Sequence, residues 1–143
     1  MRNAYHLMIL VTVASISACA MPPKPETTLL SPTEAQMQLR SYQTRSFDVA
    51  DRNRAIRAVM ATLQDLGFII ERANADLGLV TAARFAEPNY LDIIAVTVTV
   101  RQNSDDTMMV RVNAIYNNAP IEDPKAYQNF FATLQRALFL GTE

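Results

Sequence analysis

Residues 91–101, LDIIAVTVTVR, decide the fold of this chain. Apolar and polar side chains alternate along the stretch, as in a strand with one buried and one exposed face. The alternation resumes at residues 108–116 after an Asn-Ser-Asp-Asp turn at 103–106. The two segments therefore predict an antiparallel hairpin with one buried face. That face is expected to hold Ile94, Val96, Val98, Val100, Met108, Val110, Val112, Ala114 and Tyr116.

Three more strands and a helix are predicted before the hairpin. Residues 44–47, 68–72 and 79–85 are short strand-like runs, and the last two are separated by a turn that ends at Gly78. Between the first two runs, Asp48 or Asp51 is expected to cap a helix that ends at Gly67. Its apolar face comprises Ile56, Val59, Met60, Leu63 and Leu66. The opposite face is interpreted as a solvated surface, made of Arg52, Arg54, Arg57, Gln64 and Asp65.

A second amphipathic helix follows the sheet. Asp123 and Pro124 combine a cap with a first-turn proline, and Gly141 is expected to end the helix. Its apolar face comprises Tyr127, Phe130, Phe131, Leu134, Ala137 and Leu138. Because a half-apolar sheet needs cover, we expect both helices to pack on one face. The predicted fold class is α+β, in the order β-α-β-β-β-β-α, with one antiparallel sheet of four to five strands and two helices over residues 42–143.

The N-terminal residues are typical of a lipoprotein precursor. Arg2 is followed by an apolar run at residues 7–14, which is too short to span a bilayer as a helix of about 20 residues. Residues 16–19, Ile-Ser-Ala-Cys, have the pattern of a lipobox. We therefore predict a signal peptide over residues 1–18 and lipidation at Cys19. The alternative is an ordinary secretory signal in which Cys19 has no role, but Cys19 is the single cysteine in the sequence and has no disulfide partner.

Residues 19–41 are interpreted as a lipidated cysteine followed by a flexible tether. Four prolines, at positions 22, 23, 25 and 32, favour extended conformations. A short helix from Ser31 to Arg40, with Ser31 as its cap and Pro32 in its first turn, is compatible with this interpretation. Ala20 follows the cysteine in place of the aspartate that resembles an inner-membrane retention signal. We therefore expect the protein in the outer membrane, with its domain facing the periplasm.

Several segments resemble an uncharacterised family of small proteobacterial lipoproteins. They are residues 63–68 (LQDLGF), 75–82 (ADLGLVTA) and 123–131 (DPKAYQNFF), together with the lipobox. Relatives in this family have a longer, glycine-rich excursion where this chain has the short segment 86–90. The order of helix, Gly-Phe, strand, Asp-Leu-Gly and strand is also similar to the helix-grip domains of the accessory lipoprotein of the β-barrel assembly machine. The resemblance implies an envelope lipoprotein and no known activity.

Composition argues against several function classes. The chain has 13 basic and 14 acidic residues, so after loss of Arg2 its net charge is near −2, which gives no field for nucleic acid. His6, the single histidine, lies in the predicted signal peptide, so no imidazole or free thiol is expected for catalysis or for a zinc site. Three acidic pairs fall at predicted caps and turns, where aspartate has backbone roles: Asp48 with Asp51, Asp105 with Asp106, and Glu122 with Asp123. We expect no enzyme activity, metal or cofactor.

Two functional classes remain. The first is an envelope scaffold that binds another protein through an exposed sheet face, an edge strand or a helix groove. The second is a module that grips a small apolar ligand or lipid between helices and sheet, lined by residues such as Phe68, Ile94, Met108 and Phe131. A domain of about 100 residues needs nearly all of its apolar side chains for its own core, which favours the scaffold. A cavity of ligand size would favour the binding module.

Overall fold

The computed structural model of the chain describes residues 31–88 and 90–140. The predicted signal peptide, Cys19 and the predicted helix stop at Gly141 lie outside these residues. The described residues from Pro32 onward form one compact unit. Among the described residues, no helix is both long enough and apolar enough to cross a membrane.

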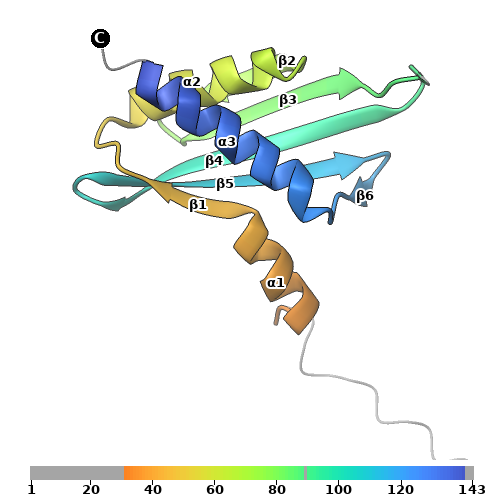
Figure 1. The fold of residues 1–143 in the computed structure, drawn as a ribbon, viewed down its shortest axis with the longest axis horizontal. Coiled ribbons are helices and arrows are strands. Elements are labelled where there is room, and N and C mark those ends of the chain that lie inside the picture. The colour runs from red at the N-terminus through yellow and green to blue at the C-terminus, as the bar shows by residue number, and fades with distance from the viewer. Residues whose placement is uncertain (1–30, 89, 141–143) are drawn as a thin grey trace, which may run out of the picture. The chain divides into compact units, whose positions relative to one another are not determined.

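A six-stranded antiparallel sheet forms the centre of this unit (Figure 1). Its main strands lie in the order β1-β5-β4-β3-β2, and the short β6 pairs with the last residues of β5, whereas β1 pairs with its first half. The bounds are β1 Thr44–Phe47, β2 Ile69–Asn74, β3 Leu79–Phe85, β4 Ile93–Ser104, β5 Thr107–Tyr116 and β6 Ala119–Pro120. The α+β class and the single antiparallel sheet agree with the prediction, to which the structure adds β6.

Three helices accompany the sheet: α1 Glu34–Tyr42, α2 Arg52–Asp65 and α3 Pro124–Leu140. Helices α2 and α3 lie over the same face of the sheet (Figure 1), and this confirms the predicted layers. The side chain of Asp51 caps α2 by accepting a hydrogen bond from the backbone N–H of Asn53 at 2.8 Å. After α2, Gly67 adopts a φ of +80°, which suits a residue without a Cβ atom.

The predicted hairpin is β4 with β5, and its alternation decides which face is buried. In register, Val98 pairs with Val112 and Val100 with Val110. All four side chains are buried beneath the helices, whereas Thr97 and Arg111 point to the opposite, uncovered face. The hairpin's predicted buried face is confirmed except at its ends, where Ile94 is half-buried and Tyr116 is 40% exposed.

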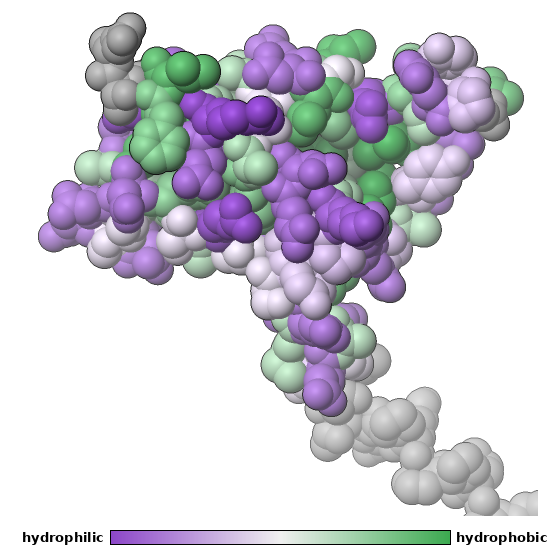
Figure 2. Space-filling model, viewed as in Figure 1, coloured by the Kyte–Doolittle hydropathy of each residue, from purple (hydrophilic) through white to green (hydrophobic). Residues whose placement is uncertain are grey.

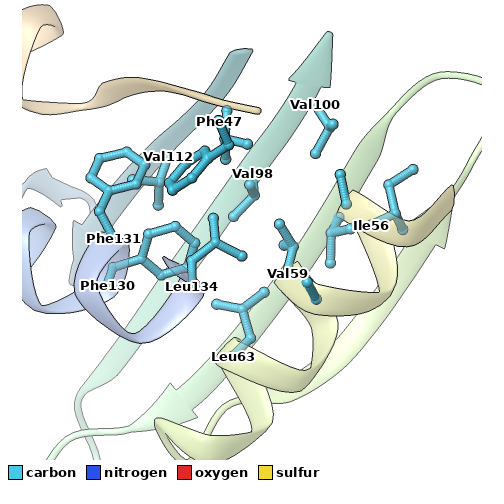
Figure 3. Packing of buried hydrophobic residues seen from close by; sticks show 14 of the residues in the cluster. Phe47, Ile56, Val59, Leu63, Val98, Val100, Val112, Phe130, Phe131 and Leu134 are labelled. Atoms are coloured by element: carbon cyan, nitrogen blue, oxygen red, sulfur yellow. The ribbon is translucent and has the colours of Figure 1, made fainter. Parts of the chain in front are cut away.

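The helices contact the sheet through an apolar core (Figure 3). Leu63 and Val59 on α2 and Leu134 on α3 have no exposed surface. Phe131 packs against Phe47 of β1, with ring centroids 6.1 Å apart. Packing of this kind is the main source of stability in a domain of this size.

Helix α1 differs in detail from the prediction. Thr33, not Ser31, is its cap: the side chain of Thr33 accepts from the N–H of Gln36 and the side chain of Gln36 accepts from the N–H of Thr33, which forms a capping box. Leu39 packs against the core. Gln43, at the end of the helix, is 3% exposed and its amide donates to the hydroxyl of Tyr127 at 3.2 Å. The segment predicted as tether therefore carries a helix that contacts the core.

The interpretation of α2's outer face as a solvated surface is wrong at Arg54, which contacts α3. Its guanidinium donates to the carbonyl of Leu138 at 2.8 Å, which satisfies one of the orphan carbonyls at the end of α3. Its Nε atom is buried without a hydrogen-bond partner. Sequence spacing placed Arg54 on the solvent side of its own helix, but the neighbouring helix covers that position.

Candidate functional site

A cavity that is partly open to solvent lies between the two helices and the sheet. Its volume is about 580 Å³, which falls within the range of about 300–1,000 Å³ typical of small-molecule sites. The end of α2 and the first half of α3 form its walls, and β4 and β5 form its floor. The apolar residues that line it are Leu63, Leu66, Phe68, Ile94, Val96, Val112, Ala114, Ile121, Ala126 and Phe130. In Figure 2, hydrophobic residues are visible between polar ones in the right half of the view, over the end of the sheet where β3 and β5 finish.

The small side chain of Ala114 helps to explain why the cavity exists. In register, Val96 lies between Ala82 and Ala114, so this row of the covered face has two small side chains. The neighbouring row has three valines, Val80, Val98 and Val112, which fill the space beneath the helices. The floor is therefore lower at the Ala114 row than at the valine row.

Charged side chains line part of the cavity. Arg84 on β3 and Lys125 in the first turn of α3 both line it, and both are exposed. The guanidinium carbon of Arg84 lies 5.0 Å from the ring centroid of Phe68, which is a cation–π contact with a wall residue. Asp123 also lines the cavity, but its carboxylate accepts a hydrogen bond from the backbone N–H of Lys125 at 2.9 Å and so caps α3.

A polar cluster fixes the sheet beside the cavity. The hydroxyl of Tyr116 and the amide of Asn117 both donate to the carboxylate of Asp92. These two hydrogen bonds hold the pKa of Asp92 below its ordinary value, and the bond to Asp92 raises the pKa of Tyr116. Asn117 also accepts from the N–H of Ile93 at 3.0 Å. Because Tyr116 pairs with Ile94, the cluster fixes the strand ends that form one edge of the floor.

The uncovered face of the sheet carries a second surface of interest, an apolar row. Register places Ile69, Ala83, Ala95, Ile115 and Pro120 side by side across β2, β3, β4, β5 and β6. Ile69 is 70% exposed. The next position along the sheet adds the pair Phe85 and Ile93, which are 57% and 46% exposed.

Arginine and small polar side chains occupy the other part of the uncovered face. A shallow hollow of about 420 Å³ is lined there by Thr97, Thr99, Arg101, Met109, Arg111 and Asn113. The uncovered face therefore has an apolar part and a basic, hydroxyl-rich part, as a contact surface often does.

The structure brings together only some of the residues named from sequence. Phe68 and Ile94 line the cavity, whereas Met108 and Phe131 are each 1% exposed, belong to the packed core and do not line it. Sequence reasoning missed Arg84 and Lys125 as lining residues. Arg84 breaks the apolar run of its strand and Lys125 follows a helix cap, but neither feature specifies a cavity.

The predicted acidic pairs have mainly backbone roles. Asp51 and Asp123 accept from N–H groups at helix starts, and Asp105 and Asp106 form the turn between β4 and β5. Within residues 31–88 and 90–140, no group of three or more His, Cys, Asp or Glu residues is placed to hold a metal ion.

Comparison with known proteins defines no family. No family model matches the chain, and no curated protein matches it. Among solved structures, it is similar to the adenylate sensor from AMP-activated protein kinase in complex with 5-aminoimidazole-4-carboxamide 1-beta-D-ribofuranotide, with a TM-score of 0.48 and 13% identity over 66% of this chain and 94% of that one. A likeness this weak carries no functional argument. The fold is α+β, with an open antiparallel sheet that helices cover on one face.

Proposed function

We propose that the folded domain binds a small apolar ligand in the cavity between its helices and its sheet. The volume and the apolar lining of the cavity support this function. A domain of this size normally uses its apolar side chains to fill its own core. The hollow of about 580 Å³ on the helix-covered side is partly open to solvent and leaves apolar side chains of both helices and the sheet uncovered, and this observation carries the proposal.

Filling the cavity tests the proposal. Ala114→Leu adds three carbon atoms to the floor of the cavity, whereas Ala95→Leu adds the same atoms to the uncovered face of the neighbouring strand. We expect a neutral naphthylamine probe, whose fluorescence rises in apolar surroundings, to bind the full chain and the Ala95→Leu variant with similar affinity. Ala114→Leu should weaken this binding at least tenfold. Equal binding by both variants, or no binding by the unaltered chain, would contradict the proposal.

We further propose that the domain is anchored in the outer membrane by lipid on Cys19 and faces the periplasm. The support is the sequence pattern of residues 16–19 and the absence of any other cysteine. More than one acyl chain gives durable anchoring, since each buried methylene contributes about 0.8 kcal/mol. Labelled palmitate should enter the unaltered chain and not the Cys19→Ala variant, which should leave the membrane fraction. An unmodified thiol in the mass spectrum of the mature protein would contradict the anchor.

A second candidate function is binding of an envelope protein partner by the uncovered face. The apolar row defined above, Ile69 to Pro120, favours it because a row of this kind is seldom left exposed without a role. A photo-crosslinking residue at Ile93, on this face, should yield a discrete protein adduct in intact cells. The same residue at Gln64, on the outer face of α2, serves as the control. Identical adducts from both positions would argue against a specific surface.

A further inference from the structure

The charge around the cavity narrows the class of ligand. In the described part of the chain, no carboxylate oxygen lies within 4.0 Å of a side-chain nitrogen of Arg84 or Lys125, so neither forms an ion pair. Asp123 is the acidic residue among the lining residues, and its carboxylate accepts a hydrogen bond from the backbone N–H of Lys125 at the start of α3. Two cations and one carboxylate among the described lining residues therefore leave a largely apolar cavity with a net positive charge.

Arg84 is held where it reaches the cavity. Its guanidinium lies over Phe68, which lines the same cavity, and its strand partner Ile94 forms part of the floor. A guanidinium on an aromatic face keeps its N–H donors free for an oxyanion, because the ring engages only the face of the cation. Lys125 adds a second positive charge from the first turn of α3.

We infer that the cavity takes a single-chain amphiphile with an anionic head: the acyl chain lies along the apolar walls and Arg84 and Lys125 bind the carboxylate or phosphate. This inference rests on the proposed binding function and adds the chemical class of the ligand. The volume suits one chain, since two-chain lipids exceed the range of small-molecule sites. The head group binds through charge-assisted hydrogen bonds, which are about twice as strong as neutral ones.

The experiment compares ligands that share a chain and differ in the head group. Laurate, a lysophosphatidylglycerol with the same acyl chain, and dodecanol are titrated calorimetrically into the full 143-residue chain without detergent. We expect both anionic ligands to bind at least tenfold more tightly than dodecanol, since hydrogen bonds to a charged group are about twice as strong as those between neutral groups. Tighter binding of the lysophospholipid than of laurate would identify phosphate as the natural head, and the reverse order would identify a fatty acid.

Two double variants test which cations bind the anionic head group. Arg84→Gln with Lys125→Gln should reduce laurate affinity roughly tenfold and leave dodecanol binding unchanged, which also shows that the variant is folded. Arg101→Gln with Arg111→Gln removes the same two charges from the uncovered face and should change neither ligand. Arg84→Lys should retain most of the preference for the anion.

The two proposals fail in different ways. Equal affinity for laurate and dodecanol, or loss of laurate affinity only in the Arg101 and Arg111 variant, would overturn the anionic head while leaving an apolar site. Absence of binding by all three ligands would overturn the binding function itself.

Discussion

The helix-covered side of the sheet has two halves that use similar residues differently. In the closed half, Val100 and Val110 pair beneath the helices, and Phe47 and Phe131 pack with ring centroids 6.1 Å apart. In the hollow half, the row centred on Val96 ends in Ala114, and a cavity of about 580 Å³ lies above it. The same layers and the same strand pairing therefore give a filled core at one end and a lined space at the other.

The two halves differ in the volume of their side chains and in the part of the helices that covers them. The closed half is covered by the middle of the helices, where Val59 and Leu134 have no exposed surface. The hollow half is covered by the end of α2 and the beginning of α3, where Leu66 and Phe68 are only half-buried. Substitutions at matched positions should therefore cost more stability in the closed half than in the hollow half.

The largest expected effect comes from truncating the aromatic ring of the closed half. Phe131→Ala should lower the free energy of unfolding by about 3–5 kcal/mol, because it leaves a void among fully packed neighbours. Phe68→Ala, in the hollow half, should cost about 1–2 kcal/mol, because its ring is partly exposed already. Urea unfolding followed by circular dichroism measures both. Equal losses would mean that the two halves are packed alike.

The next largest change in stability is expected from substituting two glycines, Gly78 beside the closed half and Gly67 beside the hollow half. A Cβ atom on Gly78 would lie 2.1 Å from the carbonyl oxygen of Val100 in the closed half, so Gly78→Ala requires the backbone to move. We expect it to destabilise the domain by roughly 3 kcal/mol. A Cβ atom on Gly67 would have no other atom within 4 Å, so Gly67→Ala should cost only the strain of a positive φ, about 1–2 kcal/mol of stability. Thermal unfolding of both variants tests the order, and a larger loss at Gly67 would contradict it.

Enlarging a side chain should destabilise the closed half but not the hollow half. Val98→Leu overfills the closed half and should cost about 1–3 kcal/mol. Ala114→Leu places its added atoms in the cavity and should leave stability unchanged or raise it, even though it weakens probe binding. Chemical unfolding of the two variants alongside the unaltered chain supplies the measurement. A large loss at Ala114 would mean that the cavity does not accept added atoms.

The smallest expected effect concerns pH and the strand ends of the hollow half. Hydrogen bonds from Tyr116 and Asn117 lower the pKa of Asp92 in the folded chain. A group with a lowered folded pKa stabilises the fold above its unfolded pKa, near 3.9 for aspartate, and this contribution is lost as pH falls. Tyr116→Phe removes one donor and should therefore flatten the fall in stability between about pH 5 and pH 3. Tyr90→Phe, on an exposed tyrosine of the nearby loop, should leave the pH profile unchanged.

Alternation and helical spacing made most of the fold predictable. Residues 94–100 and 108–114 place every second side chain on one face whatever the surroundings, because a strand has a period of two. The spacing of Val59 and Leu63 in α2, and of Phe131 and Leu134 in α3, likewise fixes which stripe of each helix is buried. β6 escaped prediction because two residues carry no periodicity, and Arg54 was misplaced because the carbonyl it binds belongs to another helix.

By itself, the sequence determined the α+β class, the buried face of the hairpin and the two helices that cover it, since these follow from local periodicity and capping. Only the tertiary structure decided that the cover is incomplete over Ala114 and that Arg84 and Lys125, 41 positions apart in the numbering, line the same cavity. The physical reason is that the size of a cavity depends on the summed volumes of side chains from several helices and strands. No single stretch of sequence contains that sum.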